Sequence, residues 1–413
     1  MRRLLAVSWE MPPMYGPRAT QVMRTIAALA AVGRRSTVVC LAPRRGGPHW
    51  RDGVEISAPE GVELLRVPSP EEWLLARVAR RLVPVLRHLP DPQRVWVGRA
   101  TRAAVRAAAS EDYAGTITFA QPWSDHLVGL RVRRATRLPW VAHFSDPWVD
   151  SPYATGLRWR RSVCRRMEAE VIREADALVF VADETADLVM RKYPAEWRRK
   201  ASVVPHGFDP RVDAAHDGKA RRPGPMRIVH TGRFYSGVRT PVAVLRALAG
   251  LHAREPLTGV LELIFVGPHI QEFTRDAAAL GVDSLVQFRD RVPPAEAAAI
   301  AAAADVLLVV DAPSRGPSAF LPSKLVDYLR FRKPMLGVTP EVGASASLLR
   351  RLGCPVASPD DVDAISAALA ELIGEWRAGR LGVSASFDHV AAEYDIRRTT
   401  ARLSDILTRT FDR

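Results

Sequence analysis

Residues 227–239 read RIVHTGRFYSGVR and carry the clearest evidence on the fold class. The apolar start of this stretch predicts a buried strand, a glycine-bearing loop follows it, and helical periodicity resumes after the loop. Strands that alternate with helices in this way build parallel sheets with crossover helices. Further strands are expected at 261–266, 286–288, 306–310 and 335–338, with a helix at 323–331 between the last two.

The first half of the chain repeats this alternation. A chain of 413 residues is too long for one hydrophobic core, because single cores stop growing at roughly 250 to 300 residues. We therefore predict an α/β protein of two doubly wound, Rossmann-like domains, with the carboxyl ends of both sheets facing an interdomain cleft. The expected strands of the first domain are 4–9, 37–41, 116–119, 140–144 and 177–181, and its first clear helix is 21–32.

A change of composition at 210–225 marks the domain boundary, since prolines and polar residues replace the apolar pattern there. We predict an N-terminal domain at 1–209, a hinge at 210–225 and a C-terminal domain at 226–385. The tail, 386–413, is helical in pattern and is expected to cross back to the first domain.

Composition favours a soluble cytoplasmic protein. Hydrophobic residues make up 47% of the chain and charged residues 25%, and the apolar run at 297–310 is broken by Asp305. The basic start is interpreted as a strand rather than a signal peptide. Three widely separated cysteines, Cys40, Cys164 and Cys354, indicate neither a disulfide framework nor a metal site.

The net charge of +14 is unevenly placed. Residues 1–209 hold 33 basic against 22 acidic residues, or +11, and residues 210–413 hold 26 against 23, or +3. A basic helix expected at 73–89 and the arginines of 158–166 suit an anionic membrane, so peripheral binding at its inner face is one hypothesis. A helix packed on its own domain, with a solvated basic face, is the alternative. No nucleic-acid-binding module is evident, so no nucleic acid is expected.

Three segments of the first half carry candidate site residues. Gly16 and Arg18 lie where a loop meets a helix start, which suits a phosphate or sugar, although an ordinary loop would look the same. His143 and Asp146 follow a strand and suit acid/base catalysis or substrate orientation, with a turn-capping Asp as the alternative. His206 lies in a Pro-His-Gly turn and is a candidate for donor binding, although a lone histidine there is more often structural.

The second half offers a site for a diphosphate. Arg233 and Arg239 flank a loop that begins at Gly232, and guanidinium groups form short charge-assisted bonds to phosphate. Gly267 follows another strand, where the backbone could approach a ligand. The helix start at Ser323 and Lys324 can face an anion, and Asp327, one turn later, can accept hydrogen bonds from ribose hydroxyls. An amphipathic helix packed inward is the alternative interpretation of that segment.

Taken in order, these segments resemble retaining nucleotide-sugar glycosyltransferases of the GT-B fold, family 4 (glycosyl transferases group 1) in particular. The likeness covers nearly the whole chain. It lies in Pro12-Pro13 to Gly16, in Val204-Pro205-His206-Gly207 with Asp209, in Thr231-Gly232-Arg233 with Arg239, in Phe265-Val266-Gly267, and in Pro322-Ser323-Lys324-Leu325-Val326-Asp327-Tyr328.

The resemblance implies transfer of a sugar from a nucleotide-diphosphate sugar to a hydroxyl acceptor: a glycan, a lipid-linked molecule or a small molecule. It implies neither a metal nor a cofactor, and it places His143 or Asp146 near the sugar. The family often has two glutamates eight positions apart, for which this chain has Ala319 and Asp327. Donor identity and retention of configuration are therefore open. A GT-B epimerase and a basic nucleic-acid-binding protein are the rival interpretations.

Overall fold

The computed structural model describes residues 2–14, 16–47, 49–50, 58–70, 89–151, 157–210, 224–268, 271–314 and 316–412. The chain divides into two compact units, Met1–Gly207 with Ile396–Arg413, and Phe208–Asp395. Most of the predicted hinge at 210–225 and nearly all of the predicted basic helix at 73–89 lie outside the described residues. Each unit is described by itself.

The first unit is built on a seven-stranded sheet of order β3-β2-β1-β4-β5-β6-β7, in which every pair is parallel. The five predicted strands are all present, and β3 and β7 are additional. The strands are β1 Arg3–Val7, β2 Ser36–Leu41, β3 Val62–Val67, β4 Tyr113–Ala120, β5 Trp140–Phe144, β6 Ala177–Phe180 and β7 Ala201–Val203.

Helices cover both faces of this sheet, as in doubly wound folds. α1 begins at Pro17, a residue suited to the first helical turn because its missing N–H needs no partner there. The helices of this unit are α1 Pro17–Ala31, α3 Val97–Ser110, α4 Ser124–Thr136, α5 Arg158–Glu174, α6 Asp183–Met190, α7 Ala195–Arg198 and α15 Ile396–Phe411, with a 3₁₀ turn at Pro92–Val95.

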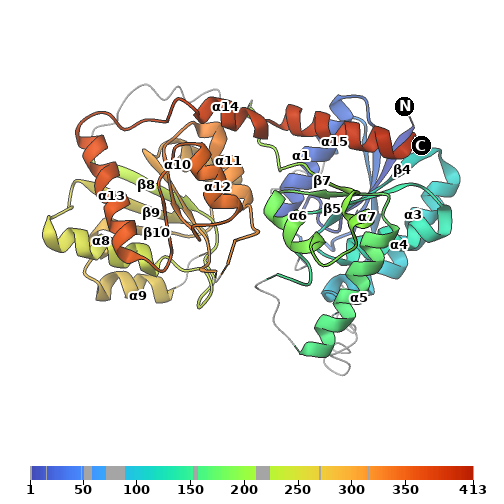
Figure 1. The fold of residues 1–413 in the computed structure, drawn as a ribbon, viewed down its shortest axis with the longest axis horizontal. Helices are drawn as coiled ribbons and strands as arrows, with labels where there is room; N and C mark the ends of the chain where they lie inside the picture. Colours follow the sequence, from blue (N-terminus) through green and yellow to red (C-terminus); the bar gives the residue numbers. More distant parts are fainter. Residues whose placement is uncertain are drawn as a thin grey trace. The chain divides into compact units, whose positions relative to one another are not determined.

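The C-terminal helix α15 belongs to the first unit and runs beside α1 (Figure 1). Its apolar face buries Leu403, Leu407 and Phe411 in the core that covers one side of the sheet. Gly115 makes room for this contact, because a Cβ there would lie 2.4 Å from the Phe411 ring. The predicted tail helix is therefore interrupted: α14 (Phe387–Ala391) stays with the second unit and α15 returns to the first.

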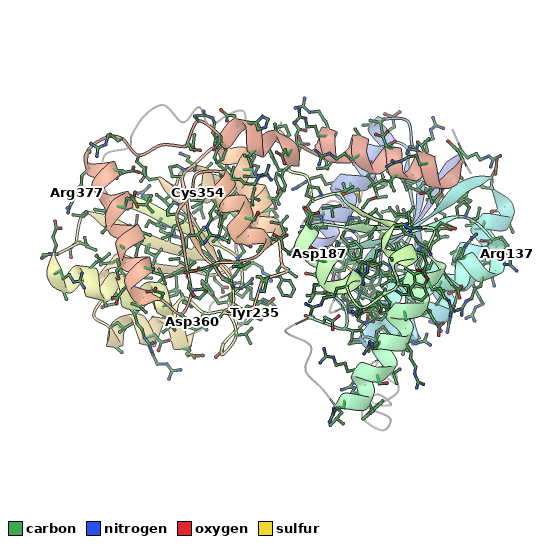
Figure 2. The ribbon with its side chains drawn as sticks, viewed as in Figure 1. Arg137, Asp187, Tyr235, Cys354, Asp360 and Arg377 are labelled. Atoms are coloured by element: carbon green, nitrogen blue, oxygen red, sulfur yellow. The ribbon has the colours of Figure 1, made fainter. Side chains whose placement is uncertain are left out.

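The second unit has a six-stranded parallel sheet of order β10-β9-β8-β11-β12-β13. α8 and α13 lie together on one face of it (Figure 1). Side chains fill the space between sheet and helices, as Figure 2 shows. The strands are β8 Met226–Thr231, β9 Leu261–Val266, β10 Val286–Arg289, β11 Val306–Val310, β12 Met335–Val338 and β13 Val356–Ala357. The helices are α8 Val242–Arg254, α9 Gln271–Ala279, α10 Pro294–Ala302, α11 Ser323–Tyr328, α12 Ala344–Arg351 and α13 Val362–Arg377. There are 3₁₀ turns at Asp283–Leu285, Leu329–Phe331 and Ala392–Tyr394.

Both sheets reverse their strand order once, and this reversal determines where a ligand can bind. In the first sheet the reversal lies between β1 and β4, and in the second between β8 and β11. At such a point the chain segments that follow the two adjacent strands leave in opposite directions. This opens a crevice at the carboxyl ends of the strands. Within the described part of the chain, no helix is both long and apolar enough to cross a membrane.

Candidate functional site

At the reversal point of the second sheet, two glycines bring backbone segments unusually close to neighbouring atoms. Gly232, just after β8, has a φ of +142°, and a Cβ on it would lie 2.7 Å from Lys324 Nζ. A Cβ on Gly267, just after β9, would lie 2.0 Å from the carbonyl oxygen of Gly232. Only glycine fits both positions, and the approach of the backbone at Gly267 to a ligand stays a prediction.

Lys324 is positioned by a neutral partner rather than by a carboxylate. Nδ1 of His230 lies 2.9 Å from the carbonyl oxygen of Leu308, and it must donate there because a carbonyl only accepts. Nε2 of His230 is therefore the acceptor for Lys324 Nζ, 3.1 Å away. Burial lowers the pKa of Lys324 to about 7, with the charge of Arg239 lowering it further and Asp311 opposing. Burial likewise holds the pKa of His230 well below its usual range.

Arg239 and Arg233 surround the exposed ring of Tyr235, which Figure 2 labels. The guanidinium carbons lie 5.2 Å and 5.9 Å, respectively, from the ring centroid. Arg239 also donates to the carbonyl oxygen of Arg233 at 2.6 Å, while its Nε is buried without a hydrogen-bond partner among the described residues. The loop therefore concentrates positive charge beside Lys324, which suits an anionic ligand.

The segment after β11 differs from its sequence prediction in one respect. α11 has only six residues, Ser323–Tyr328, and continues as a 3₁₀ turn, so its short dipole adds little to anion binding. Positive charge at this site comes from side chains. The hydroxyl of Tyr328 accepts the N–H of Thr231 at 2.7 Å, which ties this helix to the end of β8. Asp327 is half-buried on the same helix.

A second cluster lies at the reversal point of the first sheet and centres on Arg18. Its guanidinium is 3.8 Å from Asp146, and Glu10 and Asp125 also act on it electrostatically. Burial lowers the pKa of Arg18, and these three carboxylates oppose that shift. Asp146 accepts the Gln121 amide at 3.3 Å, and burial raises the pKa of Asp146 despite Arg18.

His143 and His206 complete the cluster around Arg18. The centroids of their rings lie 6.0 Å apart. Burial lowers the pKa of His143 to about 3, with Arg18 contributing, and the same causes hold the pKa of His206 well below normal. Both rings are therefore neutral near pH 7 and can exchange hydrogen bonds without carrying charge. The structure places His206 with these first-unit residues, although the sequence suggested a role in donor binding.

The predicted phosphate loop at Gly16 and Arg18 already has a negative neighbour. A Cβ on Gly16 would lie 3.4 Å from Glu10 Oε2, and the N–H of Ala19, in the first turn of α1, donates to the Glu10 carboxylate. Gly16 itself has extended backbone, with φ of −176°, so no left-handed conformation requires a glycine. The helix start thus offers a phosphate less than the sequence indicated, because a carboxylate occupies part of it.

Residues 19–212 match the family model described as Glycosyltransferase Family 4. The resemblance to glycosyltransferase family 4 is confirmed.

Curated relatives and solved structures extend the likeness. The D-inositol 3-phosphate glycosyltransferase of Corynebacterium kroppenstedtii is 27% identical over 225 residues, 51% of this chain and 50% of that protein. The chain thus spans about half the length of the curated relatives it matches. Sucrose-phosphate synthase from Thermosynechococcus elongatus aligns at a TM-score of 0.73 and 15% identity, covering 100% of both chains. Anabaena HepE in complex with UDP aligns at 0.66 and 15%, covering 99% and 100%. These likenesses show the GT-B fold.

Sequence reasoning missed four residues of the two clusters: His230, Tyr328, Glu10 and Asp125. A histidine in the middle of an otherwise apolar strand was a usable signal for His230, because such a position normally holds an aliphatic side chain. Nothing in the local pattern revealed that Glu10 and Asp125 would reach Arg18. At the family's first glutamate position, Ala319 is buried.

Metal ligation has no visible basis in the described ranges. No group of three or more His, Cys, Asp or Glu side chains there is arranged to hold an ion. The expectation that no metal takes part stays a prediction.

Proposed function

We propose that the protein transfers a sugar from a nucleoside-diphosphate sugar to a hydroxyl acceptor. The observation that carries this proposal is the cationic site at the reversal point of the second sheet. Arg239 and Lys324 lie close enough there for the charge of Arg239 to lower the pKa of Lys324, and Asp311 opposes that shift. Two cations held close together, with one carboxylate acting on Lys324, suit a ligand that brings further negative charge.

The diphosphate is the leaving group of this reaction, so the same cations act on the chemical step. As the bond to the anomeric carbon breaks, negative charge grows on the diphosphate oxygen. Lys324 and Arg239 stabilise that charge from fixed positions, an effect that is stronger in a partly buried site than in water. The glycines at 232 and 267 let the backbone approach the phosphate oxygens. UDP is the first nucleotide to test, because HepE, a protein of the same fold, is described in complex with UDP.

The first unit supplies the acceptor side in this proposal. Asp146 is its strongest candidate for catalysis, since burial raises the pKa of its carboxyl and so makes it a better proton acceptor. His143 is neutral and can orient a hydroxyl group without repelling a cationic or polar substrate. Arg18 and Gln121 hold the Asp146 carboxylate between them.

Calorimetric titration of the full chain with UDP, GDP, ADP and TDP tests the donor site. At least one diphosphate should bind, and Arg239→Met should weaken it by tenfold or more. Arg246→Met is the matched control, because Arg246 is exposed on α8 and should leave affinity unchanged. If no diphosphate raises the melting temperature or releases heat, the donor site does not exist. Acceptor-dependent release of the nucleotide from its sugar then distinguishes transfer from epimerisation.

We also propose that the protein binds peripherally to a membrane. The start of α5 exposes two large apolar side chains, Leu157 at 65% and Trp159 at 41%, beside the exposed Arg158, Arg165 and Arg166. Apolar and cationic groups together favour the interface of an anionic bilayer. Trp159→Ser combined with Arg165→Gln should reduce flotation with anionic vesicles at low salt, whereas Arg102→Gln should not. Equal flotation of all three proteins would rule this location out.

A further inference from the structure

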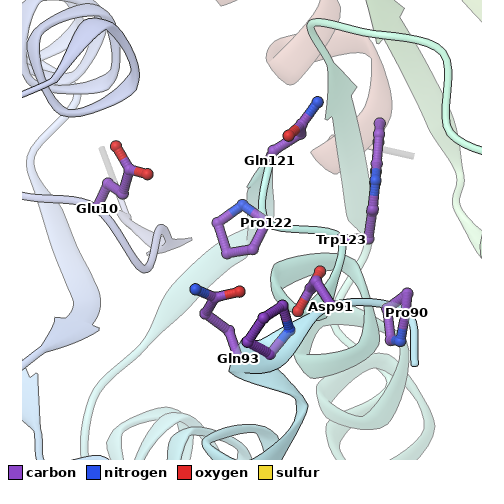
Figure 3. Close-up of a pocket in the computed structure, with 8 residues that line it drawn as sticks. Glu10, Pro90, Asp91, Gln93, Gln121, Pro122 and Trp123 are labelled. Atoms are coloured by element: carbon purple, nitrogen blue, oxygen red, sulfur yellow. The ribbon is translucent and has the colours of Figure 1, made fainter. Parts of the chain in front are cut away.

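A pocket of about 360 Å³ opens at the reversal point of the first sheet (Figure 3). Its walls come from the segments that follow β1 and β4, together with the turn at residues 90–93. The volume falls in the range of small-molecule sites, roughly 300 to 1,000 Å³. Its place at the carboxyl ends of β1 and β4 is the one at which doubly wound folds bind ligands.

The polar side chains that line this pocket are two carboxylates and two amides. Glu10 lies on the segment after β1, Asp91 and Gln93 on the turn, and Gln121 after β4, while Trp123 adds an aromatic wall. Figure 3 shows these side chains arranged around Pro122. Among the lining residues there is no Lys, Arg or His. Carboxylates only accept hydrogen bonds, and amides both donate and accept, so the set matches hydroxyl groups and offers a phosphate little.

The walls are held in place by contacts of their own. Asp91 accepts the backbone N–H of Ser124 at 2.9 Å and its hydroxyl at 2.5 Å, which fixes the turn against the start of α4. Trp123 stacks on Trp148 with centroids 5.1 Å apart and ring planes 3° from parallel. A pocket whose walls are fixed before the ligand arrives loses less entropy on binding.

The charge around the pocket is negative. Four carboxyl groups lie here: Glu10, Asp125 and Asp146 act on the guanidinium of Arg18, and Asp91 acts on Asp125 and on the guanidinium of Arg94. Burial raises the pKa of all four, because the surroundings already resist negative charge. A phosphorylated ligand would bring two further negative charges next to these carboxyl groups. Repulsion of that kind is how a site rejects one of two similar ligands.

We propose that this pocket is the acceptor site and that it takes an uncharged or amino-bearing polyol, such as a sugar or cyclitol without phosphate or carboxylate near the bound ring. This rests on the proposed function for the identity of the site as the acceptor site. Hydroxyls of the ring donate to Glu10, the amides of Gln93 and Gln121 donate back, and the ring rests against Trp123. The acceptor class thereby differs from the phosphorylated cyclitol in the name of the corynebacterial relatives.

Ligand-observed saturation-transfer NMR on the full chain with saturating UDP tests this proposal. The probes are matched pairs that differ only in phosphate: myo-inositol with D-myo-inositol 3-phosphate, and glucose with glucose 6-phosphate; glucosamine is the amino-bearing probe. The unphosphorylated member of at least one pair should bind tenfold or more tightly than its partner. Glu10→Gln should reduce that ratio at least threefold, because it removes a charge and keeps the shape.

Glu60→Gln is the matched control, since Glu60 is an exposed carboxylate outside the pocket and its removal should leave the ratio unchanged. If Glu10→Gln fails to fold, Gln93→Lys replaces it and should shift the ratio toward the phosphorylated partner. Tighter binding of the phosphorylated members, no binding of any probe, or a ratio that neither variant moves would each overturn the inference. UDP binding on the same samples separates these results from failure of the proposed function, which would show as absence of UDP binding.

Discussion

The protonation of Lys324 should make UDP binding depend on pH. In the free protein the pKa of this amine is lowered to about 7 by burial and by Arg239, so the amine loses its charge as pH rises through 7. A bound diphosphate favours the charged form and raises that pKa, by about 1 to 3 units for an opposite charge in direct contact. Binding therefore takes up a proton between the free and the bound pKa. Affinity is fully present below pH 7 and is lost as pH rises toward the bound value.

The size of the effect follows from the two pKa values. Each unit between them corresponds to about 1.4 kcal/mol, or tenfold in affinity. UDP should thus bind about 5 to 100 times more weakly at pH 9.5 than at pH 7. Neither His230 nor the terminal phosphate explains such a slope, because the pKa of His230 lies well below this window and the phosphate is ionised above its pKa of about 6.

Titration calorimetry at pH 7, 8, 9 and 9.5 measures the slope, and titration in buffers of different ionisation enthalpy counts the proton. Lys324→Met should weaken binding at pH 7 by about 1.5 to 3 kcal/mol, the contribution of a charged hydrogen bond, and should abolish the slope. Arg246→Met should retain both. An affinity that is flat from pH 7 to 9.5, or a Lys324→Met protein that keeps the slope, would refute the assignment of Lys324 to the diphosphate.

Three further substitutions have distinct expected outcomes. Gly232→Ala places a Cβ 2.7 Å from Lys324 Nζ at a positive φ, so UDP affinity measured by calorimetry should fall at least tenfold. Tyr328→Phe leaves the N–H of Thr231 without its acceptor, and urea unfolding should show a loss of about 1 to 3 kcal/mol. Asp146→Asn should lower kcat by about 10² to 10⁴ with UDP affinity unchanged; full activity would exclude it as a catalytic residue.

The alternating pattern was sufficient to predict the sheets, because buried parallel strands have nearly continuous apolar sequences. β3 and β7 were missed for a physical reason. β3 is an edge strand that carries Glu63 and Arg66, and β7 has only three residues, so neither shows such a run. The break in the C-terminal helix was missed as well, since periodicity alone does not show which unit a helical turn packs against.

The candidate donor site could be predicted in part because parallel topology brings the carboxyl ends of neighbouring strands together. Gly232 and Lys324 are 92 positions apart, and both follow strands that meet at the reversal point. His230 could not be assigned a role, because its two hydrogen bonds reach β11 and α11. Such contacts depend on side-chain geometry that no sequence pattern encodes.

Net charge and the charges at the reversal point differ in each unit. Residues 1–209 carry +11, yet the cluster at the reversal point of their sheet sets three carboxyl groups about Arg18. Residues 210–413 carry only +3, yet their reversal point holds Lys324 and Arg239 together. Much of the basic surplus of the first unit is exposed, as on α5, where solvent screens it. What a site attracts depends on the partly buried charges within a few ångströms of the ligand. On that basis we propose the diphosphate for the less basic unit and an uncharged polyol for the more basic one.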